Sequence, residues 1–258
     1  MKSRWSDHAT TIGLPLLVLV GVIFLWQAIV TLGGYEIYLL PGPLDVAGSM
    51  WQRREQLLGY TFRTGTAALA GFALSLLIGV AVALLFSQSR LIRQSGYPYA
   101  IFFQTVPIVA IAPLVITLFG YGLASVIVVA TIISLFPIIT STTTGLITTD
   151  AGLVDLFRLN RASRWQILWK LQFPGAIRYL VTGMKTSSGL AVVGAIVGEF
   201  FSGYGVGAQG LGYFIRSSSD NLNTPNLFAG MICSTLLGVG VFASIALVER
   251  FFLRRWIY

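Results

Sequence analysis

Histidine and cysteine are almost absent from this chain of 258 residues, which contains only His8 and Cys233. A single cysteine cannot form an intramolecular disulfide, and it cannot make a zinc site with one distant histidine. Because His8 lies in the N-terminal segment, we interpret it as a bystander, and no serine–histidine–aspartate set can be assembled. We therefore expect no metal site and no catalytic residues, and we expect the chain not to be an enzyme.

Charge is also scarce, because 10% of the residues are charged against roughly 25% in ordinary soluble domains. Hydrophobic residues make up 55% of the chain, and the mean hydropathy is +0.81. Too little polar material remains to solvate a globular surface, so membrane lipid is the expected solvent. The net charge of +8 does not indicate a nucleic-acid partner, because the basic residues gather between apolar runs as in membrane loops.

Several apolar runs are long enough to cross a bilayer, which takes about 20 mostly apolar residues in a helix. The six runs cover residues 11–32, 64–86, 97–119, 122–146, 179–200 and 227–248. The first follows Lys2 and Arg4 as in a signal peptide, but it exceeds the ~7–15-residue core of such a peptide and is expected to be retained. Only Gly120 and Tyr121 separate the third run from the fourth, which predicts a tight hairpin. We expect one all-α membrane domain over residues 1–258.

Lysine and arginine predict the orientation of the spans, because cytoplasmic loops are enriched in both. If the N-terminus is cytoplasmic, only four of the 17 basic residues lie outside, namely Arg53, Arg54, Arg63 and Arg216. This orientation places both termini in the cytoplasm. It also makes residues 148–178 the longest and most basic cytoplasmic segment.

The outer connection between the first two spans begins with Pro41-Gly42-Pro43, which stops a helix and forces an extended turn. The residues after it predict an amphipathic helix over 44–61 that lies along the outer membrane surface. Its apolar side would carry Val46, Met50, Leu57 and Leu58, and its wet side Arg53, Arg54 and Glu55.

The cytoplasmic segment 148–178 predicts two short helices. The first covers residues 150–159 and is broken at Ala162-Ser163, where Ser163 is a suitable N-cap for the second. The second covers 164–172, and Phe173-Pro174 is expected to end it. It would present Trp165, Leu168 and Trp169 on one side, either to lipid headgroups or to a groove on a partner protein.

This segment resembles the cytoplasmic motif of ABC importer permeases, which reads Glu-Ala-Ala, three residues, Gly, then an apolar-Pro pair about nine residues later. The matching positions are Asp155, Leu156 and Phe157 for Glu-Ala-Ala, Arg161 for Gly, then Ala162, Ser163, Arg164 and Trp165, and finally Phe173-Pro174. The resemblance implies that the segment couples the spans to an ATPase subunit, with Leu168 and Trp169 on the docking helix. Arg161 departs from the motif, because a left-handed turn is strained for any residue but glycine. Either the turn is built differently or it uses a conformation open to arginine.

Other segments resemble one branch of that family, the permeases for nitrate, sulfonates, taurine, bicarbonate and pyrimidine precursors. They are Pro41-Gly42-Pro43, residues 105–114 followed by Phe119-Gly120, Glu199 followed by Gly210-Leu211-Gly212, and Glu249-Arg250.

The resemblance implies a six-span type I importer permease in the inner membrane of a bacterium. Two copies would form the pathway for a small solute, although a heterodimer is equally open. ATPase subunits would carry ATP and Mg, and an extracytoplasmic binding protein would deliver the substrate. The chain itself has no phosphate-binding Gly-x-x-x-x-Gly-Lys-Ser/Thr loop, so we expect it to bind no cofactor.

Polar residues inside the spans need an explanation, because they are costly in lipid. We expect Gln104, Thr105, Ser187 and Ser188 to line the translocation path, with Glu199 near its outer mouth. The alternative is hydrogen bonding between helices. Lys185 lies near a cytoplasmic end and is expected to extend its ammonium group to the interface.

Three questions stay open at this point. A self-sufficient secondary transporter or channel is the rival function, although no internal repeat and few buried carboxylates support it. Residues 205–210 match a dinucleotide-binding glycine pattern by letter, but without a preceding strand they indicate an outer loop. The substrate can be a small anion or a neutral heterocycle, because no lone intramembrane arginine marks an anion site.

Overall fold

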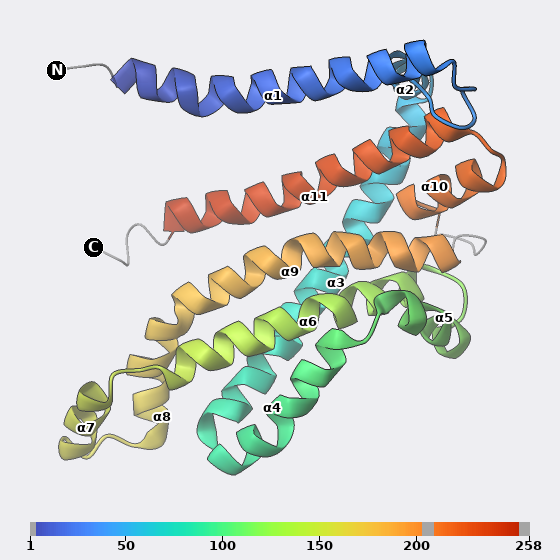
Figure 1. Cartoon of the computed structure of the whole chain (residues 1–258). Coiled ribbons are helices and arrows are strands. Elements are labelled where there is room, and N and C mark those ends of the chain that lie inside the picture. Colours follow the sequence, from blue (N-terminus) through green and yellow to red (C-terminus); the bar gives the residue numbers. More distant parts are fainter. Residues whose placement is uncertain (1–3, 203–208, 253–258) are drawn as a thin grey trace.

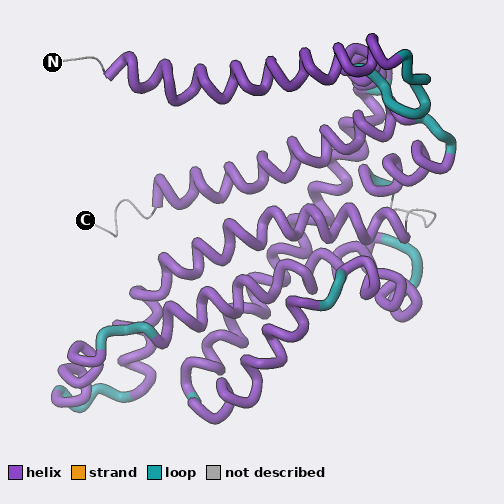
Figure 2. Tube along the Cα trace, viewed as in Figure 1, coloured by secondary structure: helices purple, strands orange, loops and turns teal. Residues whose placement is uncertain are grey.

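The computed structural model describes residues 4–202 and 209–252, and every regular element in those two ranges is a helix (Figures 1 and 2). Residues 205–208 of the glycine pattern, together with Lys2, Arg254 and Arg255, lie outside the described residues. The all-α prediction is confirmed for the part of the chain that the structure describes.

Within residues 4–202 and 209–252, five long helices are apolar enough to cross a membrane. They are α1 (Arg4–Gly33), α3 (Arg54–Gln88), α6 (Leu123–Ile147), α9 (Phe173–Ser202) and α11 (Thr224–Phe252). In its most apolar stretch α6 is 56% buried, whereas the corresponding stretch of α1 is 0% buried. Helix α6 is therefore the centre of the bundle, and α1 lies at its edge.

The third predicted span is a broken helix and not a continuous one. Helix α4 (Arg90–Thr105) and helix α5 (Ile108–Phe119) meet at an angle of 99°. Pro107 has no N–H to donate, and a proline disfavours the helical conformation at the residue before it, so Val106 is extended (φ −70°, ψ 125°). The predicted hairpin is confirmed, since residues 120–122 alone join α5 to α6, with φ angles of +80° at Gly120 and +154° at Gly122.

The predicted surface helix over 44–61 is also wrong in its extent. Helix α2 (Pro43–Gln52) stops at Arg53, and α3 begins at Arg54, well before the predicted start of the second span. The turn brings Val46 of α2 and Leu57 of α3 into one buried cluster with Leu211 of α10 (Leu211–Asp220). Because Leu57 packs there, the chain forms two helices and not one.

Helices α3, α6 and α9 approach closely through glycine. A Cβ atom at Gly194 of α9 would lie 2.7 Å from the Cα of Ala130 on α6, and one at Gly71 of α3 would lie 2.6 Å from the Cβ of Ala130. A side chain at either position would overlap its neighbour. This contact fixes the register of the three central helices.

The two ends of the bundle differ in their short helices (Figure 1). Helices α7 (Ala151–Leu159) and α8 (Arg164–Ile167) lie at the end where α1 begins and α11 finishes. Helices α2, α5 and α10 lie at the opposite end. Residues 148–178 and the helices α2, α5 and α10 are therefore at opposite ends of the bundle.

Candidate coupling segment and translocation pathway

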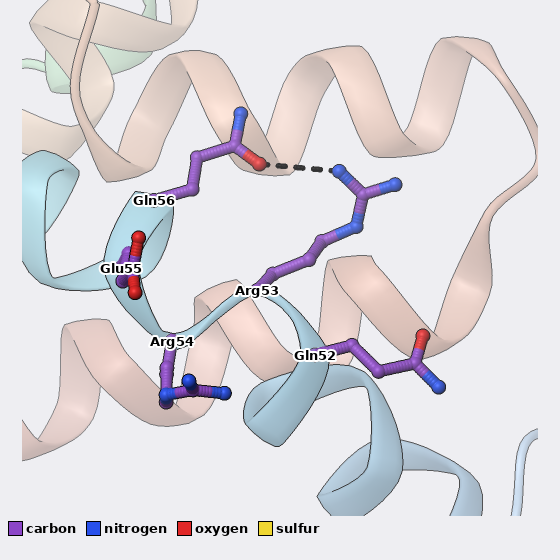
Figure 3. Close-up of a pocket in the computed structure, with 5 residues that line it drawn as sticks. All are labelled: Gln52, Arg53, Arg54, Glu55 and Gln56. Carbon is purple, nitrogen blue, oxygen red and sulfur yellow. Dashed lines mark hydrogen bonds between the residues drawn. The ribbon is translucent and has the colours of Figure 1, made fainter.

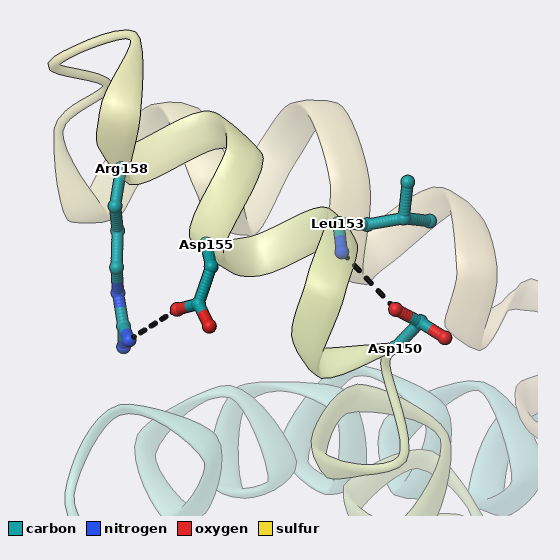
Figure 4. Close-up of polar contacts among 4 residues, drawn as sticks. All are labelled: Asp150, Leu153, Asp155 and Arg158. Carbon is teal, nitrogen blue, oxygen red and sulfur yellow. Dashed lines mark hydrogen bonds and ion pairs between the residues drawn. The ribbon is translucent and has the colours of Figure 1, made fainter.

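Helix α7 confirms the first of the two short helices predicted for residues 148–178. The Asp150 carboxylate caps its N-terminus by accepting the Leu153 N–H at 3.1 Å (Figure 4). One turn later, Asp155 and Arg158 form an ion pair of 3.1 Å on the surface. The pair is exposed, and such pairs contribute about 0–1 kcal/mol, so the capping bond is the more important contact.

The end of α7 shows how the turn accommodates Arg161. The Ala162 N–H donates to the Phe157 carbonyl at 3.0 Å, and the Arg161 N–H donates to the Arg158 carbonyl at 2.9 Å. These two bonds define a Schellman motif over residues 157–162, which places its fifth residue, at the C′ position, in the left-handed conformation. Arg161 adopts that conformation with φ +56°. The turn is thus built as a glycine would build it, at a cost of about 1–2 kcal/mol for a side-chain residue.

Ser163 is the N-cap of the second helix, as predicted. Its hydroxyl accepts the Gln166 N–H at 3.3 Å, and the Gln166 side chain accepts the Ser163 N–H at 2.7 Å. This reciprocal capping box fixes the direction in which the chain leaves the turn. The Gln166 side chain supplies one of the two hydrogen bonds of this capping box, and the prediction from the sequence did not include Gln166.

The second helix does not end at Phe173-Pro174, which corrects the prediction. After α8 the chain forms one π-helical turn, η1 (Leu168–Gln172), and continues directly into α9. Pro174 removes a hydrogen bond and its ring would press on the carbonyl four residues earlier in a regular α-helix. A wider π turn just before the proline removes that conflict. The coupling helix and the fifth span are consequently one continuous helical rod.

Trp165, Leu168 and Trp169 were predicted to share one face of the helix, but Leu168 lies on a different face from the two tryptophans. Leu168 is 0% exposed and packs with Ala83 of α3 and Leu146 of α6, whereas Trp165 is 66% and Trp169 52% exposed. The buried side of the rod passes through Leu168, and the tryptophans lie on the side turned away from the bundle. Leu168 anchors the segment, and the two tryptophans are left available for contact.

A hollow of about 340 Å³ lies between α7 and the rod. It is lined by Leu156, Phe157, Asn160, Ala162, Gln166 and Lys170. Three of these were predicted coupling residues, and Asn160, Gln166 and Lys170 are additions. Arg161, Arg164 and Pro174 are exposed close by.

Two serines predicted to line the pathway are buried and bonded within the protomer. The Ser187 hydroxyl donates to the Ser134 carbonyl of α6 at 2.6 Å, and the Ser188 hydroxyl donates to the Lys185 carbonyl at 2.7 Å. Both side chains are 0% exposed. The alternative interpretation, hydrogen bonding between and within helices, describes their contacts.

Glu199 is likewise buried, at 2% exposure, and connects three helices. Its carboxylate accepts the Thr64 hydroxyl at 2.8 Å and the Gly212 N–H at 2.9 Å, while Thr64 accepts the Leu211 N–H at 2.9 Å. A Cβ at Gly210 would lie 2.1 Å from the carboxylate, so a side chain there would displace the carboxylate from these bonds. The carboxylate ties α3, α9 and the start of α10 together.

Gln104 and Thr105 lie at the break between α4 and α5, and both are exposed, unlike the two buried serines. Gln104 lines a hollow of about 220 Å³ with Phe103, Ile108, Phe136 and other apolar side chains. The Thr105 hydroxyl donates to the Phe102 carbonyl at 2.7 Å. The five predicted pathway residues therefore do not share one surface.

Lys185 forms an ion pair with Glu249 of α11. Both side chains are partly exposed, at 28% and 35%. The sequence predicted that the Lys185 ammonium group extends to the interface, and the structure adds Glu249 as its partner. This pair links the fifth and sixth spans.

The opposite end of the bundle carries a basic surface at the turn between α2 and α3 (Figure 3). A hollow of about 570 Å³ is lined by residues 52–56, and Arg53 donates to the Gln56 side chain at 3.1 Å across it. The Arg54 guanidinium lies 5.0 Å from the centre of the Trp51 ring. Arg53, Arg54 and Glu55 are exposed, as the sequence predicted.

Comparison with known families decides the class of this molecule. Residues 75–258 match the family described as "binding-protein-dependent transport system inner membrane component". The chain belongs to this family. It is 35% identical to the riboflavin transport system permease protein RibX of Chloroflexus aurantiacus over 94% of this chain and 90% of that protein. It is 31% identical to the formylaminopyrimidine transport permease protein ThiX of Halalkalibacterium halodurans over 93% and 94% of the two chains.

Solved structures agree on the fold of this permease. A chain of the MetNI methionine ABC transporter in an inward-facing conformation superposes with a TM-score of 0.66 at 18% identity, covering 77% of this chain and 97% of that one. An amino acid ABC transporter gives a TM-score of 0.60 at 15% identity, covering 80% and 97%. The protein is a multi-pass inner-membrane permease subunit of an ABC importer with the type I fold.

Proposed function

We propose that α7, α8 and η1 dock on an ATP-binding-cassette ATPase subunit, and that ATP and Mg bind to that subunit and not to this chain. The observation that carries the proposal is the exposure of Trp165 and Trp169 on a helical rod continuous with α9. Exposed tryptophans on a short rigid helix are typical anchors of protein interfaces. The coupling segment, residues 148–178, is then the contact through which ATP hydrolysis on the partner moves the spans.

The route of that motion is supported by packing. Helix α9 continues from the rod, and α6 leads into α7 through residues 148–150. Along the membrane, Gly194 meets Ala130 and Ser187 bonds to Ser134, which holds α6 and α9 together. A displacement of α8 therefore moves both spans as one unit, and the result is alternating access without any chemistry on this chain.

The assembly we propose contains two copies of this chain, two ATPase subunits and an extracytoplasmic binding protein. Residues 1–258 form a single permease domain in lipid. Both termini and the α7–α8 end face the cytoplasm, which the clustering of basic residues supports. The opposite end, with the arginine-bearing turn at 52–56, receives the binding protein. Of the predicted path, Gln104 and Thr105 remain our candidates for lining it, since both are exposed at the α4–α5 break.

The substrate is a small solute. Curated relatives include permeases named for riboflavin and formylaminopyrimidine, and more distant ones for aliphatic sulfonates and bicarbonate. The first two, which are also the more similar in sequence, are named for organic heterocycles. We propose that a small organic molecule, and not an inorganic anion, is carried.

Co-expression with a cognate ATPase tests the docking proposal. The ATPase is expected to co-purify with the tagged wild-type chain, and Trp165→Ala with Trp169→Ala to weaken that association at least roughly tenfold, as expected for interface tryptophans. Trp51→Ala is the matched control, because Trp51 is 72% exposed at the opposite end. Equal recovery of the ATPase with all three proteins would contradict docking through this face.

A further inference from the structure

The hollow beside the α4–α5 break is bounded by four helices at the depth of the middle of α6. Side chains from α4, α5, α6 and α9 line it, and its volume is about 220 Å³. Of its nine lining side chains only Gln104 is polar, and none is ionisable. An anion held there would be desolvated without a cation to compensate it, which costs several kcal/mol. The lining therefore favours an uncharged occupant.

Two aromatic rings in this hollow are parallel. Phe103 of α4 and Phe136 of α6 have ring centroids 6.1 Å apart and planes only 11° from each other. Parallel aromatic faces provide large, flat contact surfaces with a preference for offset stacking. Such a wall suits a planar ring better than a branched aliphatic chain.

The break also brings main-chain polar groups to the same place. Among the residues that line the hollow, the Gln104 carbonyl at the end of α4 and the Ile108 N–H at the start of α5 have no partner within their own helices. Pro107 cannot donate, and the Val106 N–H reaches only the Phe103 carbonyl at 3.4 Å. Irregular backbone at membrane depth is tolerated where it lines a cavity. The hollow thus combines an apolar wall with donors, acceptors and one side-chain amide.

We propose that this hollow binds the transported solute and that the solute is a planar, uncharged nitrogen heteroaromatic of one or two rings. Its ring lies against Phe103 and Phe136, and its polar edge meets the Gln104 amide and the open main-chain groups. The volume is slightly below the ~300–1,000 Å³ of drug-sized pockets, which sets the limit on size. This inference rests on the permease function and adds the chemical class of its substrate.

Binding of 6,7-dimethyllumazine, a fluorescent bicyclic heteroaromatic, to the purified full chain in lipid nanodiscs tests the proposal. We expect the fluorescence of the lumazine to be quenched as the wild-type chain is added, and the quenching to reach saturation. Gln104→Ala and Phe103→Ala are expected to weaken binding roughly tenfold each, from the loss of a buried hydrogen bond and of ring contact. The matched controls are Gln94→Ala on α4 and Phe62→Ala on α3, which change the same residue types at exposed positions outside the hollow. Taurine at the same concentrations is expected not to compete.

Two results would overturn the inference. One is the absence of saturable lumazine binding by a wild-type chain that still co-purifies with its ATPase, which leaves the permease function intact and removes the substrate class. The other is equal binding by the hollow variants and their matched controls, which places the ligand elsewhere. Circular dichroism melting of each variant shows that a lost signal is not lost folding.

Discussion

At the scale of single residues, Arg161 holds a conformation that costs free energy. Its φ of +56° completes the turn after α7, and the two Schellman hydrogen bonds keep it there. No ion pair of its side chain is seen among the described residues. The strain is therefore a property of the backbone, and the residue type can be changed without losing a contact.

Replacing Arg161 by glycine is expected to stabilise the protein by about 1 kcal/mol, because glycine adopts φ > 0 without a Cβ penalty. Thermal unfolding of the purified chain in detergent measures the effect. Asn160→Gly is the matched control: Asn160 has an ordinary φ of −82°, so this change brings no stabilisation. An unchanged or lower melting temperature for Arg161→Gly would contradict the backbone-strain explanation.

Local signals made some residue roles predictable from the sequence and left others hidden. The capping role of Ser163 follows from residues three positions apart, so the sequence contains the whole motif. The contacts of Glu199 cannot be predicted from nearby residues, because its partner Thr64 lies 135 residues away in the sequence. Only the packing of α3 against α9 brings the two together. For the same reason, Glu199 was expected at a pore mouth and is found in a buried hydrogen-bond network.

At the scale of elements, the contact between α6 and α9 decides whether a displacement of α8 and η1 would be transmitted to the membrane-spanning helices. It depends on glycine positions that face backbone on the other helix. The two helices pack without large side chains between them, so they have little room to slide. The proposed mechanism requires that this contact stays rigid.

Gly194→Ala is expected to destabilise the protein by about 1–3 kcal/mol, because the new Cβ would lie 2.7 Å from the Cα of Ala130. Gly189→Ala, on the same helix with no atom within 4 Å, is expected to be neutral or to gain up to about 1 kcal/mol from helix propensity. Chemical or thermal unfolding of both variants in detergent compares them. Similar melting temperatures would show that the α6–α9 contact is not tight.

Hydropathy predicted the long helices but not their bends. Prolines occur at 98, 107 and 113 in the third span, and only Pro107 coincides with the break, while α4 and α5 continue through the other two. The sequence does not show which of the three prolines ends a helix, because a proline is also tolerated inside a helix of a membrane bundle. The π turn before Pro174 is a second example, since the apolar-Pro pair was expected to end a helix that continues.

At the scale of the whole molecule, the two ends of the bundle carry different elements, and the proposed orientation places them on opposite sides of the membrane. One end carries α7 and α8, and the other carries the arginine-bearing turn at residues 52–56. With Arg158→Cys or Arg53→Cys in a Cys233→Ser background, a membrane-impermeant maleimide is expected to label only position 53 in intact spheroplasts. After the membrane is permeabilised, both positions are expected to react. Labelling of position 158 alone in intact spheroplasts would reverse the proposed orientation.

The central claim is that ATP on a partner subunit moves α6 and α9 through α8. The α4–α5 break would move with them, because Ile108 of α5 packs in one cluster with Val129 of α6 and Val197 of α9. The most direct test uses Gln104→Cys in the Cys233→Ser background, purified with its ATPase and labelled by a thiol reagent with and without Mg-ATP. We expect the labelling rate to change severalfold on addition of Mg-ATP, and the change to disappear when Trp165→Ala and Trp169→Ala are added. A labelling rate at position 104 that is the same with and without Mg-ATP, while the ATPase stays bound and active, would contradict the account.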